Sequence, residues 1–298
     1  MKLLTVNALD LYRFPGDAVL EERYERVAAL IRSFDADIIA VQEIIADGVD
    51  AAAKRPGAVA GLRQLAEAVG RRCDADGVPA LAVGGIMHHT GLLWRDGITV
   101  VPGSVHTLTR EGAGTWHCAV SAVFDVGGPR MRVGSVQLSP FDQTRNVMDV
   151  NQLLRVFNPG DVAGFLGGDF NGVGADPGYD PDPYQGVGWH PDFVYQLDQD
   201  GAVDRRATVR LESPRLGRMQ DCARLAGVPW TATTGHHPAD AHPSRRIDRW
   251  YGTHHVPAAA ILGVAVADRA VVGDCTDHCP VLVEVDPARL HGQSRVRR

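Results

Sequence analysis

One short segment, Phe165–Asn171, combines residue types that can act on a phosphate group: Phe-Leu-Gly-Gly-Asp-Phe-Asn. Asp169 and Asn171 are two positions apart, so on an extended chain their side chains project from the same side. A carboxylate can take a proton from water, and a carboxamide can donate to a phosphoryl oxygen. Gly167 and Gly168 leave room for another backbone or a ligand. Because Asp, Asn and Gly also favour turns, the segment alone is equally consistent with a plain strand end.

Other polar side chains also stand at or next to the ends of apolar, strand-like runs. They are Asn7, Glu43, Asp248, Asp277 and His278. Strand ends in layered α/β proteins meet at one edge of a sheet, and binding sites form there. An acid inside a short apolar strand, such as Asp248, needs a partner or loses its charge. Taken one at a time, these residues have ordinary explanations, such as a buried ion pair or a strand-end cap.

The elements that must position these residues alternate between strands and helices. Amphipathic patterns predict helices at 20–34, 57–72, 143–157 and 215–226. Apolar or alternating runs predict strands at 2–7, 37–41, 80–86, 91–95, 98–101, 116–126, 130–138, 161–168, 247–252, 261–267 and 279–285. Residues 172–200 are rich in Asp, Pro, Gly and aromatics and predict a long surface loop. Two sheets packed face to face, with helices outside, would bury this order of elements.

Composition limits the class of protein. The chain has 298 residues, 45% hydrophobic and 22% charged, with a net charge of −6 and a pI near 6.0. These values predict a sizeable core and argue against a general basic coat for nucleic acid, but not against a local basic groove. The sequence shows neither a membrane-length apolar run nor a secretory signal, so we expect a cytoplasmic protein without a membrane partner. Five scattered cysteines indicate reduced thiols and neither a disulfide framework nor a zinc site.

Five segments, in order along the chain, resemble the motifs of the endonuclease/exonuclease/phosphatase superfamily, the group that holds DNase I. They are Thr5–Asn7, Val41–Glu43, Gly168–Asn171, Arg246–Asp248 and Thr276–Val281. The resemblance implies a DNase I-like α+β fold, a four-layer αββα sandwich in which two mixed β-sheets pack face to face with helices outside. We expect residues 1–286 to form a single domain with this fold. The basic tail, 287–298, is expected to be disordered.

The resemblance also implies a metal site. Glu43 would hold Mg²⁺, with Mn²⁺ as an alternative, in the oxygen-ligand environment that Mg²⁺ prefers. Asp277 would be a second carboxylate on the metal side, and Asn7 would help to place the metal-bound groups. Metal charge of this kind stabilises the phosphoryl oxygens and the leaving group.

The same resemblance implies roles for the remaining residues in an in-line attack of water on a phosphorus ester. Asp169 would orient or deprotonate the attacking water, and Asn171 would donate to the phosphate. His278 would bind a non-bridging phosphoryl oxygen, and Asp248 would fix and charge its imidazole ring.

Two positions depart from the superfamily pattern. Gln137 stands where a His or Tyr usually helps at the phosphate, and an amide can donate a hydrogen bond but cannot transfer a proton. Because loss of one such group costs about 10²–10³ in rate, reduced activity is expected unless His88, His89 or His117 compensates. Each of these histidines, taken singly, fits an ordinary surface or core-edge position. Leu9 occupies the position of an Asp in abasic-site endonucleases, which weakens that assignment.

The sequence leaves the substrate open. Residues 201–224 carry six arginines and three acids, a local charge of +3 from six minus three, and Arg245, Arg246 and Arg249 add to it. These arginines predict either a groove for a polyanion or a solvated surface, and we assign Arg246 and Gln137 to substrate binding. The aromatics of 172–200 could stack on bases or hold the loop in place.

Three hypotheses follow. The first is a nuclease-like phosphodiesterase acting on DNA or RNA. The second is a hydrolase of a small-molecule phosphate ester. The third is a weakly active or inactive member that binds a phosphorylated ligand or nucleic acid. A monomer is expected in each case.

Overall fold

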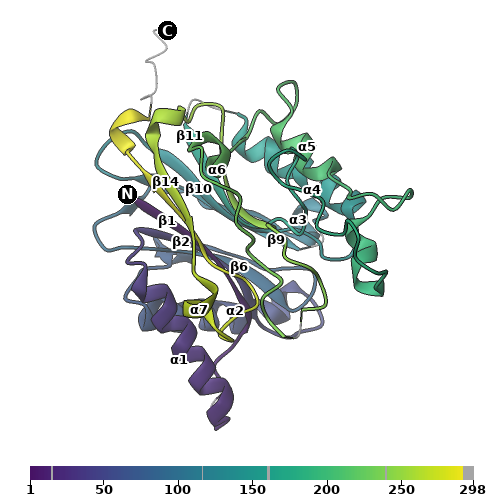
Figure 1. Ribbon diagram of the computed structural model, residues 1–298. Coiled ribbons are helices and arrows are strands. Elements are labelled where there is room, and N and C mark those ends of the chain that lie inside the picture. The colour runs from purple at the N-terminus through teal and green to yellow at the C-terminus, as the bar shows by residue number, and fades with distance from the viewer. Residues whose placement is uncertain (15, 116, 160–161, 239, 291–298) are drawn as a thin grey trace.

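The computed structural model describes residues 1–14, 16–115, 117–159, 162–238 and 240–290. Two β-sheets pack against each other, and helices cover both outer faces (Figure 1). The purple helices near the N-terminus lie on one side of the sheet pair, and the teal and green helices lie on the other. The predicted four-layer αββα sandwich is confirmed.

The first sheet is built from both ends of the chain. Its strand order is β14-β15-β1-β2-β6-β5, in which β1 and β2 are parallel and the other neighbours are antiparallel. The bounds are β1 Lys2–Leu11, β2 Ile38–Ile45, β5 Leu81–Ala82, β6 His88–Trp94, β14 Ile261–Val266 and β15 Val281–Val285. Helices α1 (Ala18–Ser33), α2 (Ala51–Ala68) and α7 (Arg269–Val272) flank this sheet.

The second sheet comes from the middle of the chain. Its order is β12-β13-β11-β10-β9-β7, with β8 also paired to β9, and β10 and β11 run parallel. The bounds are β7 Thr99–Val100, β8 His106–Leu108, β9 Cys118–Asp125, β10 Met131–Gln137, β11 Ala163–Asp169, β12 Gln220–Asp221 and β13 Asp248–Gly252. The remaining strands and α-helices are β3 Asp74–Ala75, β4 Val78–Pro79, α3 Arg110–Ala113, α4 Gln143–Phe157, α5 Arg206–Glu212 and α6 Cys222–Leu225. Three short 3-10 helices lie at Pro191–Gln196, Ala258–Ala260 and Pro287–Arg289.

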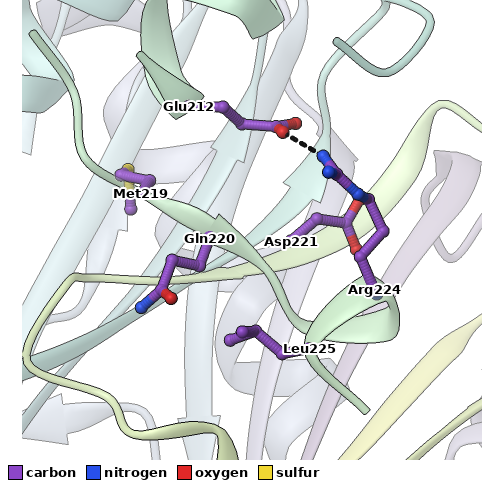
Figure 2. Close-up of a pocket in the computed structure, with 6 residues that line it drawn as sticks. All are labelled: Glu212, Met219, Gln220, Asp221, Arg224 and Leu225. Carbon is purple, nitrogen blue, oxygen red and sulfur yellow. Dashed lines mark hydrogen bonds and ion pairs between the residues drawn. The ribbon is translucent and has the colours of Figure 1, made fainter. Parts of the chain in front are cut away.

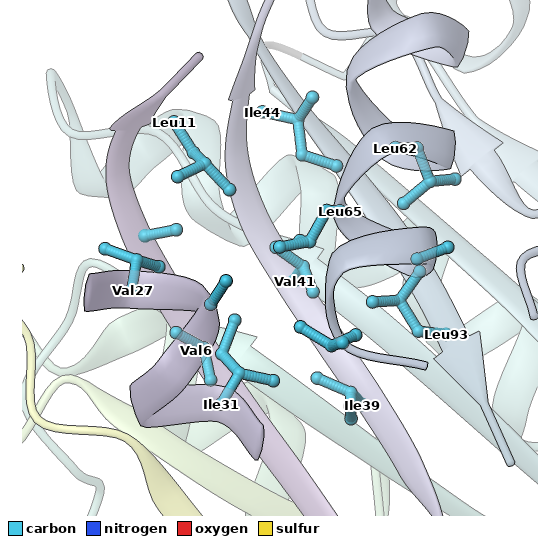
Figure 3. Packing of buried hydrophobic residues seen from close by; sticks show 14 of the residues in the cluster. Val6, Leu11, Val27, Ile31, Ile39, Val41, Ile44, Leu62, Leu65 and Leu93 are labelled. Carbon is cyan, nitrogen blue, oxygen red and sulfur yellow. The ribbon is translucent and has the colours of Figure 1, made fainter. Parts of the chain in front are cut away.

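Alternation along the strands divides the core into three apolar layers. On β1, Leu3 packs between the sheets while Leu4 packs under the helices, as the period of two requires. Figure 3 shows the layer beneath α1 and α2, where Ile31 and Leu65 lie against strand residues such as Val41. The layer between the sheets contains Trp94, Phe124, Phe165 and Trp250, and the layer under α4 and α5 contains Leu153, Phe157, Leu166 and Leu211.

The predicted helices agree with the structure except in one region. The helix predicted at 143–157 has the observed bounds, and the one predicted at 57–72 begins earlier, at Ala51, because Asp50 caps it by accepting from the Ala53 amide at 2.8 Å. Of the helix predicted over 215–226, only Cys222–Leu225 is helical, as α6. Gln220–Asp221 is instead edge strand β12, held by pairing with β13, and a helix not predicted, α5, precedes it.

The end of the chain packs further than predicted. Leu290 is buried against the layer between the sheets, and Arg289 donates to the Ala259 carbonyl at 2.9 Å. Residues 287–290 of the predicted tail are therefore packed against the domain, and the rest of it, residues 291–298, lies outside the described residues. Within the described part of the chain, none of the helices combines the length and apolarity needed to cross a membrane.

Candidate active site

Strand ends of both sheets meet at one polar cluster. Asn7 on β1 and Glu43 on β2 come from the first sheet, and Gln137 and Asp169 end the parallel strands β10 and β11 of the second. Asp248 begins β13, directly opposite Asp169 in the antiparallel register. Asp277 and His278 come from the loop that leads into β15. The convergence predicted from strand ends is therefore present.

The two glycines before Asp169 serve packing between strands. A Cβ on Gly167 would lie 2.6 Å from the Trp250 ring, and one on Gly168 would overlap the carbonyl oxygen of Val136 on β10. The sequence left open whether another part of the protein or a ligand lies against these glycines. The space is filled by the Trp250 side chain and the backbone of β10. The close approach brings Asp169 next to β10 and β13.

Asp169 is a buried carboxylate held by amides. Its Oδ1 accepts from the Asn171 backbone N–H at 2.8 Å, and its Oδ2 accepts from the side chains of Asn171 at 3.0 Å and Asn7 at 3.2 Å. Burial, together with the nearby Asp248 carboxylate, raises its pKa to about 7 in spite of the opposing charge of His278. A carboxylate with this pKa is suited to accept a proton near neutral pH.

Asn171 supports Asp169 in this arrangement. Its carboxamide nitrogen donates to Asp169 and also to the Leu138 carbonyl at 2.9 Å, so both of its N–H bonds have acceptors. A donation to phosphate, the role implied by resemblance, would require one of these hydrogen bonds to be exchanged. Asn171 has a left-handed backbone, with φ of 43°, which turns the chain sharply after β11.

His278 and Asp248 form a buried charged pair. Nδ1 of His278 lies 2.8 Å from Oδ2 of Asp248, which leaves Nε2 on the side of Asn7, whose Nδ2 is 3.5 Å away. Burial opposes protonation, but the carboxylates of Asp248, Asp277 and Asp169 overcome it and raise the pKa of His278 well above its usual value. The ring is therefore an imidazolium whose Nε2–H can donate to an anion.

Glu43 leaves the regular strand. The β1–β2 pairing shifts register between Asn7 and Leu11, and Glu43 has φ of 63°. A bulge of this kind redirects a side chain. Its Oε1 accepts from Asn7 Nδ2 at 2.9 Å and Gln137 Nε2 at 2.7 Å, and its Oε2 accepts from the Asp10 amide at 3.1 Å. Oε1 thus accepts two hydrogen bonds, whereas Oε2 accepts one and keeps a lone pair for another partner.

The donors around Glu43 fit a divalent cation. Ligand atoms of Asp10, Glu43 and His88 lie within 4.8 Å of one another. Nearby, Oε1 of Gln137 and Oδ1 of Asp277 are buried without a hydrogen-bond partner, a costly state that a cation or its bound water would relieve. Burial, together with the Glu43 charge, also raises the pKa of Asp277 above its usual value, in spite of the opposing charge of His278.

Comparisons with known proteins decide the family. Residues 18–278 match the sequence model of the Endonuclease/Exonuclease/phosphatase family. The chain belongs to this family. As the family's name states, its members are nucleases and phosphatases, which hydrolyse phosphoester bonds. A comparison with curated protein sequences gave no match.

Solved structures support the fold. A conserved protein of unknown function from Enterococcus faecalis is similar with a TM-score of 0.63 and 16% identity, over 96% of this chain and 99% of that one. An endonuclease/exonuclease/phosphatase from Bacteroides vulgatus has a TM-score of 0.63 and 16% identity, over 96% and 98%. TDP2 from Caenorhabditis elegans has a TM-score of 0.57 and 14% identity, over 95% and 73%.

The histidines considered as replacements for the family's usual His or Tyr have different surroundings. His89 is buried and bonds to the Gly84 amide and the Ala46 carbonyl, which gives it a structural role. His117 is buried and stacks on His88, with ring centroids 5.9 Å apart. His88 is bonded through Nε2 to Asp10 at 2.7 Å, beside Glu43. Of the three, His88 therefore lies in the acidic cluster of the site.

Asp10 was missed by the sequence reasoning. The sequence was compared with the abasic-site endonucleases, whose Asp stands two positions after the first Asn, where Leu9 stands here. The carboxylate that lies close to Glu43 is three positions after Asn7. Leu9 and Asp10 both have φ of 48°, and this irregular turn places the later residue in the cluster. An acid close to the first motif was the only available signal.

The assignment of Arg246 to substrate binding is wrong. Its guanidinium is buried and paired with Asp180 at 2.8 Å and Asp221 at 2.5 Å, and these two carboxylates accept from four of its five N–H donors. Most of the other arginines expected to form a polyanion groove are also engaged within the protein. Arg205 bonds to backbone carbonyls, Arg206 pairs with Asp204, Arg210 bonds to Asn151, Arg224 pairs with Glu212 and Asp176, Arg245 pairs with Asp240, and Arg249 is buried.

A groove of about 500 Å³ adjoins the site at Asp277. Its lining mixes acids with apolar side chains, among them Asp192, Asp240, Phe141 and Tyr195. Several aromatics of the long loop pack on each other, as Tyr184 does on Phe193, so they hold the loop together.

A second pocket, of about 330 Å³, is lined by Glu212, Asp221 and Arg224 at strand β12 and shares no residue with the polar cluster (Figure 2).

Proposed function

We propose that this family member is a divalent-metal-dependent phosphoester hydrolase that cleaves a phosphodiester by in-line attack of water. One observation carries the proposal. Ligand atoms of Asp169, Asp248 and His278 lie within 4.8 Å of one another, which joins a base of pKa about 7 to a charged imidazole. Proton acceptor and anion-binding group are thus within reach of one phosphate.

Each polar residue of the site would have a distinct role in this reaction. Asp169 would take the proton of the attacking water while Asn7 and Asn171 fix its orientation. His278, held charged by Asp248, would donate from Nε2 to a non-bridging phosphoryl oxygen. A divalent ion at Glu43, near Asp277, would supply positive charge to the phosphoryl oxygens and the leaving group. Gln137 would steady Glu43 through its amide.

The family and the surface beside the site give two candidate substrate classes. A nuclease-like action on DNA or RNA agrees with the family, and it is the first candidate. The engaged arginines and the acidic lining of the groove favour a second candidate, a small phosphodiester, because a long polyanion needs free positive charge along its path.

A substrate panel tests both candidates. The protein would be incubated with Mg²⁺ or Mn²⁺ and single-stranded DNA, double-stranded DNA, RNA, bis-p-nitrophenyl phosphate or p-nitrophenyl phosphate. Cleavage of nucleic acid supports the first candidate, and cleavage of the small diester alone supports the second. Release from the monoester alone, or activity unchanged in Asp169→Asn, would contradict the proposed diester hydrolysis.

A further inference from the structure

The cluster of Asp10, Glu43 and His88 mixes two carboxylates with an imidazole. His88 comes from β6, which pairs antiparallel with β2, and the register places it opposite Ile45, near Glu43. Its side chain is 20% exposed and Asp10 is 55% exposed, so the cluster is open to solvent on one side. Three mutually close donors with an open side are the arrangement that a bound cation completes with water.

The unusual backbone at this point brings the acids to the histidine. Leu9, Asp10 and Glu43 all have positive φ, which non-glycine residues seldom adopt. The Asp10 amide donates to Glu43 Oε2 at 3.1 Å, while the Asp10 carboxylate bonds to His88. Each carboxylate thus has an oxygen within 4.8 Å of a His88 ring nitrogen.

Two buried side chains next to this cluster carry polar atoms without a hydrogen-bond partner. The Gln137 side chain is 3% exposed, and while its nitrogen bonds to Glu43, its oxygen has no partner. The His117 ring, which stacks on His88, is fully buried, and neither of its nitrogens has a partner. Buried polar atoms without a hydrogen-bond partner are costly, so they mark a place where a water or ion belongs.

We infer that His88 is a nitrogen ligand of the divalent ion at Glu43, with Asp10 as a further carboxylate ligand. Imidazole favours first-row transition ions, whereas Mg²⁺ prefers oxygen ligands alone. The site therefore selects a transition ion such as Mn²⁺ over Mg²⁺. The inference rests on the proposed function only in placing a metal at Glu43.

Binding measurements test this ligand set without an activity assay. Mn²⁺ would be titrated into the protein and followed by electron paramagnetic resonance, with Mg²⁺ as competitor, in the wild type and in His88→Gln, Asp10→Asn, Glu43→Gln and the control His106→Gln. His106 is an exposed histidine on β8. Pulsed measurements on the bound Mn²⁺ would report nitrogen coupling from a ligated imidazole.

The wild type is expected to bind Mn²⁺ at least about tenfold more tightly than Mg²⁺ and to show nitrogen coupling. His88→Gln should lose the coupling and most of the preference, Asp10→Asn should bind both ions more weakly, and His106→Gln should behave as wild type. Two results would overturn the inference and leave the proposed function standing, provided that Mn²⁺ binding depends on Glu43. One is the absence of nitrogen coupling in the wild type, and the other is nitrogen coupling that persists in His88→Gln. Binding unaffected by Glu43→Gln would overturn both.

Discussion

The side chain of Gln137 is hydrogen-bonded to Glu43, with Nε2 donating to Oε1 at 2.7 Å. Gln137 also lies beside Asp169 in the parallel register of β10 and β11. Gln137, which stands where the resemblance led us to expect a His or Tyr, is thus hydrogen-bonded to the carboxylate that we propose as a metal ligand. We therefore propose that Gln137 is a positioning residue for Glu43.

Replacing Gln137 with leucine tests this role. Gln137→Leu keeps the volume but removes the donor, so Glu43 loses one of its two side-chain hydrogen bonds. Because a hydrogen bond to a charged group contributes about 1.5–3 kcal/mol, affinity for the divalent ion should fall about ten- to hundredfold. Isothermal titration calorimetry with Mn²⁺ measures this affinity, and Gln152→Leu on α4 is the control. Unchanged affinity would show that the contact does not orient Glu43.

The raised pKa of Asp169 predicts the pH dependence of hydrolysis. Asp169 accepts a proton only as the carboxylate, and its pKa is about 7. Activity should therefore be low at pH 5, rise with pH to half its plateau near pH 7, and stay high above that while His278 remains charged. Rate profiles of kcat/KM under constant metal saturation check this. A flat profile between pH 5 and 8 would mean that another group is the base.

Removal of the Asp248 charge should expose the titration of His278. In Asp248→Asn, the largest favourable charge on the imidazole is lost, so its pKa should fall. We expect a loss of about 10²–10³ in kcat and a new decline of activity at high pH, as the ring becomes neutral. Asp268→Asn, at an exposed helix cap, serves as the control. A mutant with reduced rate but the wild-type pH profile would argue against a charged His278.

The correction for Arg246 has a consequence for stability. Arg246→Met leaves the buried carboxylates of Asp180 and Asp221 without their cation. The free energy of unfolding should decrease by about 3–5 kcal/mol, as expected when one partner of a buried ion pair is removed. Urea denaturation measures this, with Arg215→Met at an exposed position as the reference. A stable variant with impaired substrate binding would restore the original assignment.

Sequence patterns predicted the parts of the structure that depend on local order. The helix at 143–157 follows from its apolar stripe, and the convergence of Asn7, Glu43 and Asp169 follows from their places at strand ends. The role of Asp10 depends on backbone dihedral angles at Leu9 that no residue type there requires.

The burial of Arg246 depends on distant contacts. One of its partners, Asp180, comes from the irregular 172–200 loop, and the other, Asp221, lies on an edge strand that was mistaken for helix. Charge counting along the sequence cannot distinguish a buried arginine from a free one. Contacts between segments far apart in the chain decide this difference.

The rate of hydrolysis of bis-p-nitrophenyl phosphate by Asp169→Asn is the most direct test of the central claim. Asparagine keeps the size of the side chain and the hydrogen bonds that one of the two oxygens accepts, but it cannot accept the proton of the attacking water. The account predicts metal-dependent release of p-nitrophenol by the wild type and a decrease of about 10²–10⁴ in kcat for the variant, with its fold and Mn²⁺ affinity preserved. A folded, metal-binding Asp169→Asn protein that retains activity within a factor of about ten would contradict it.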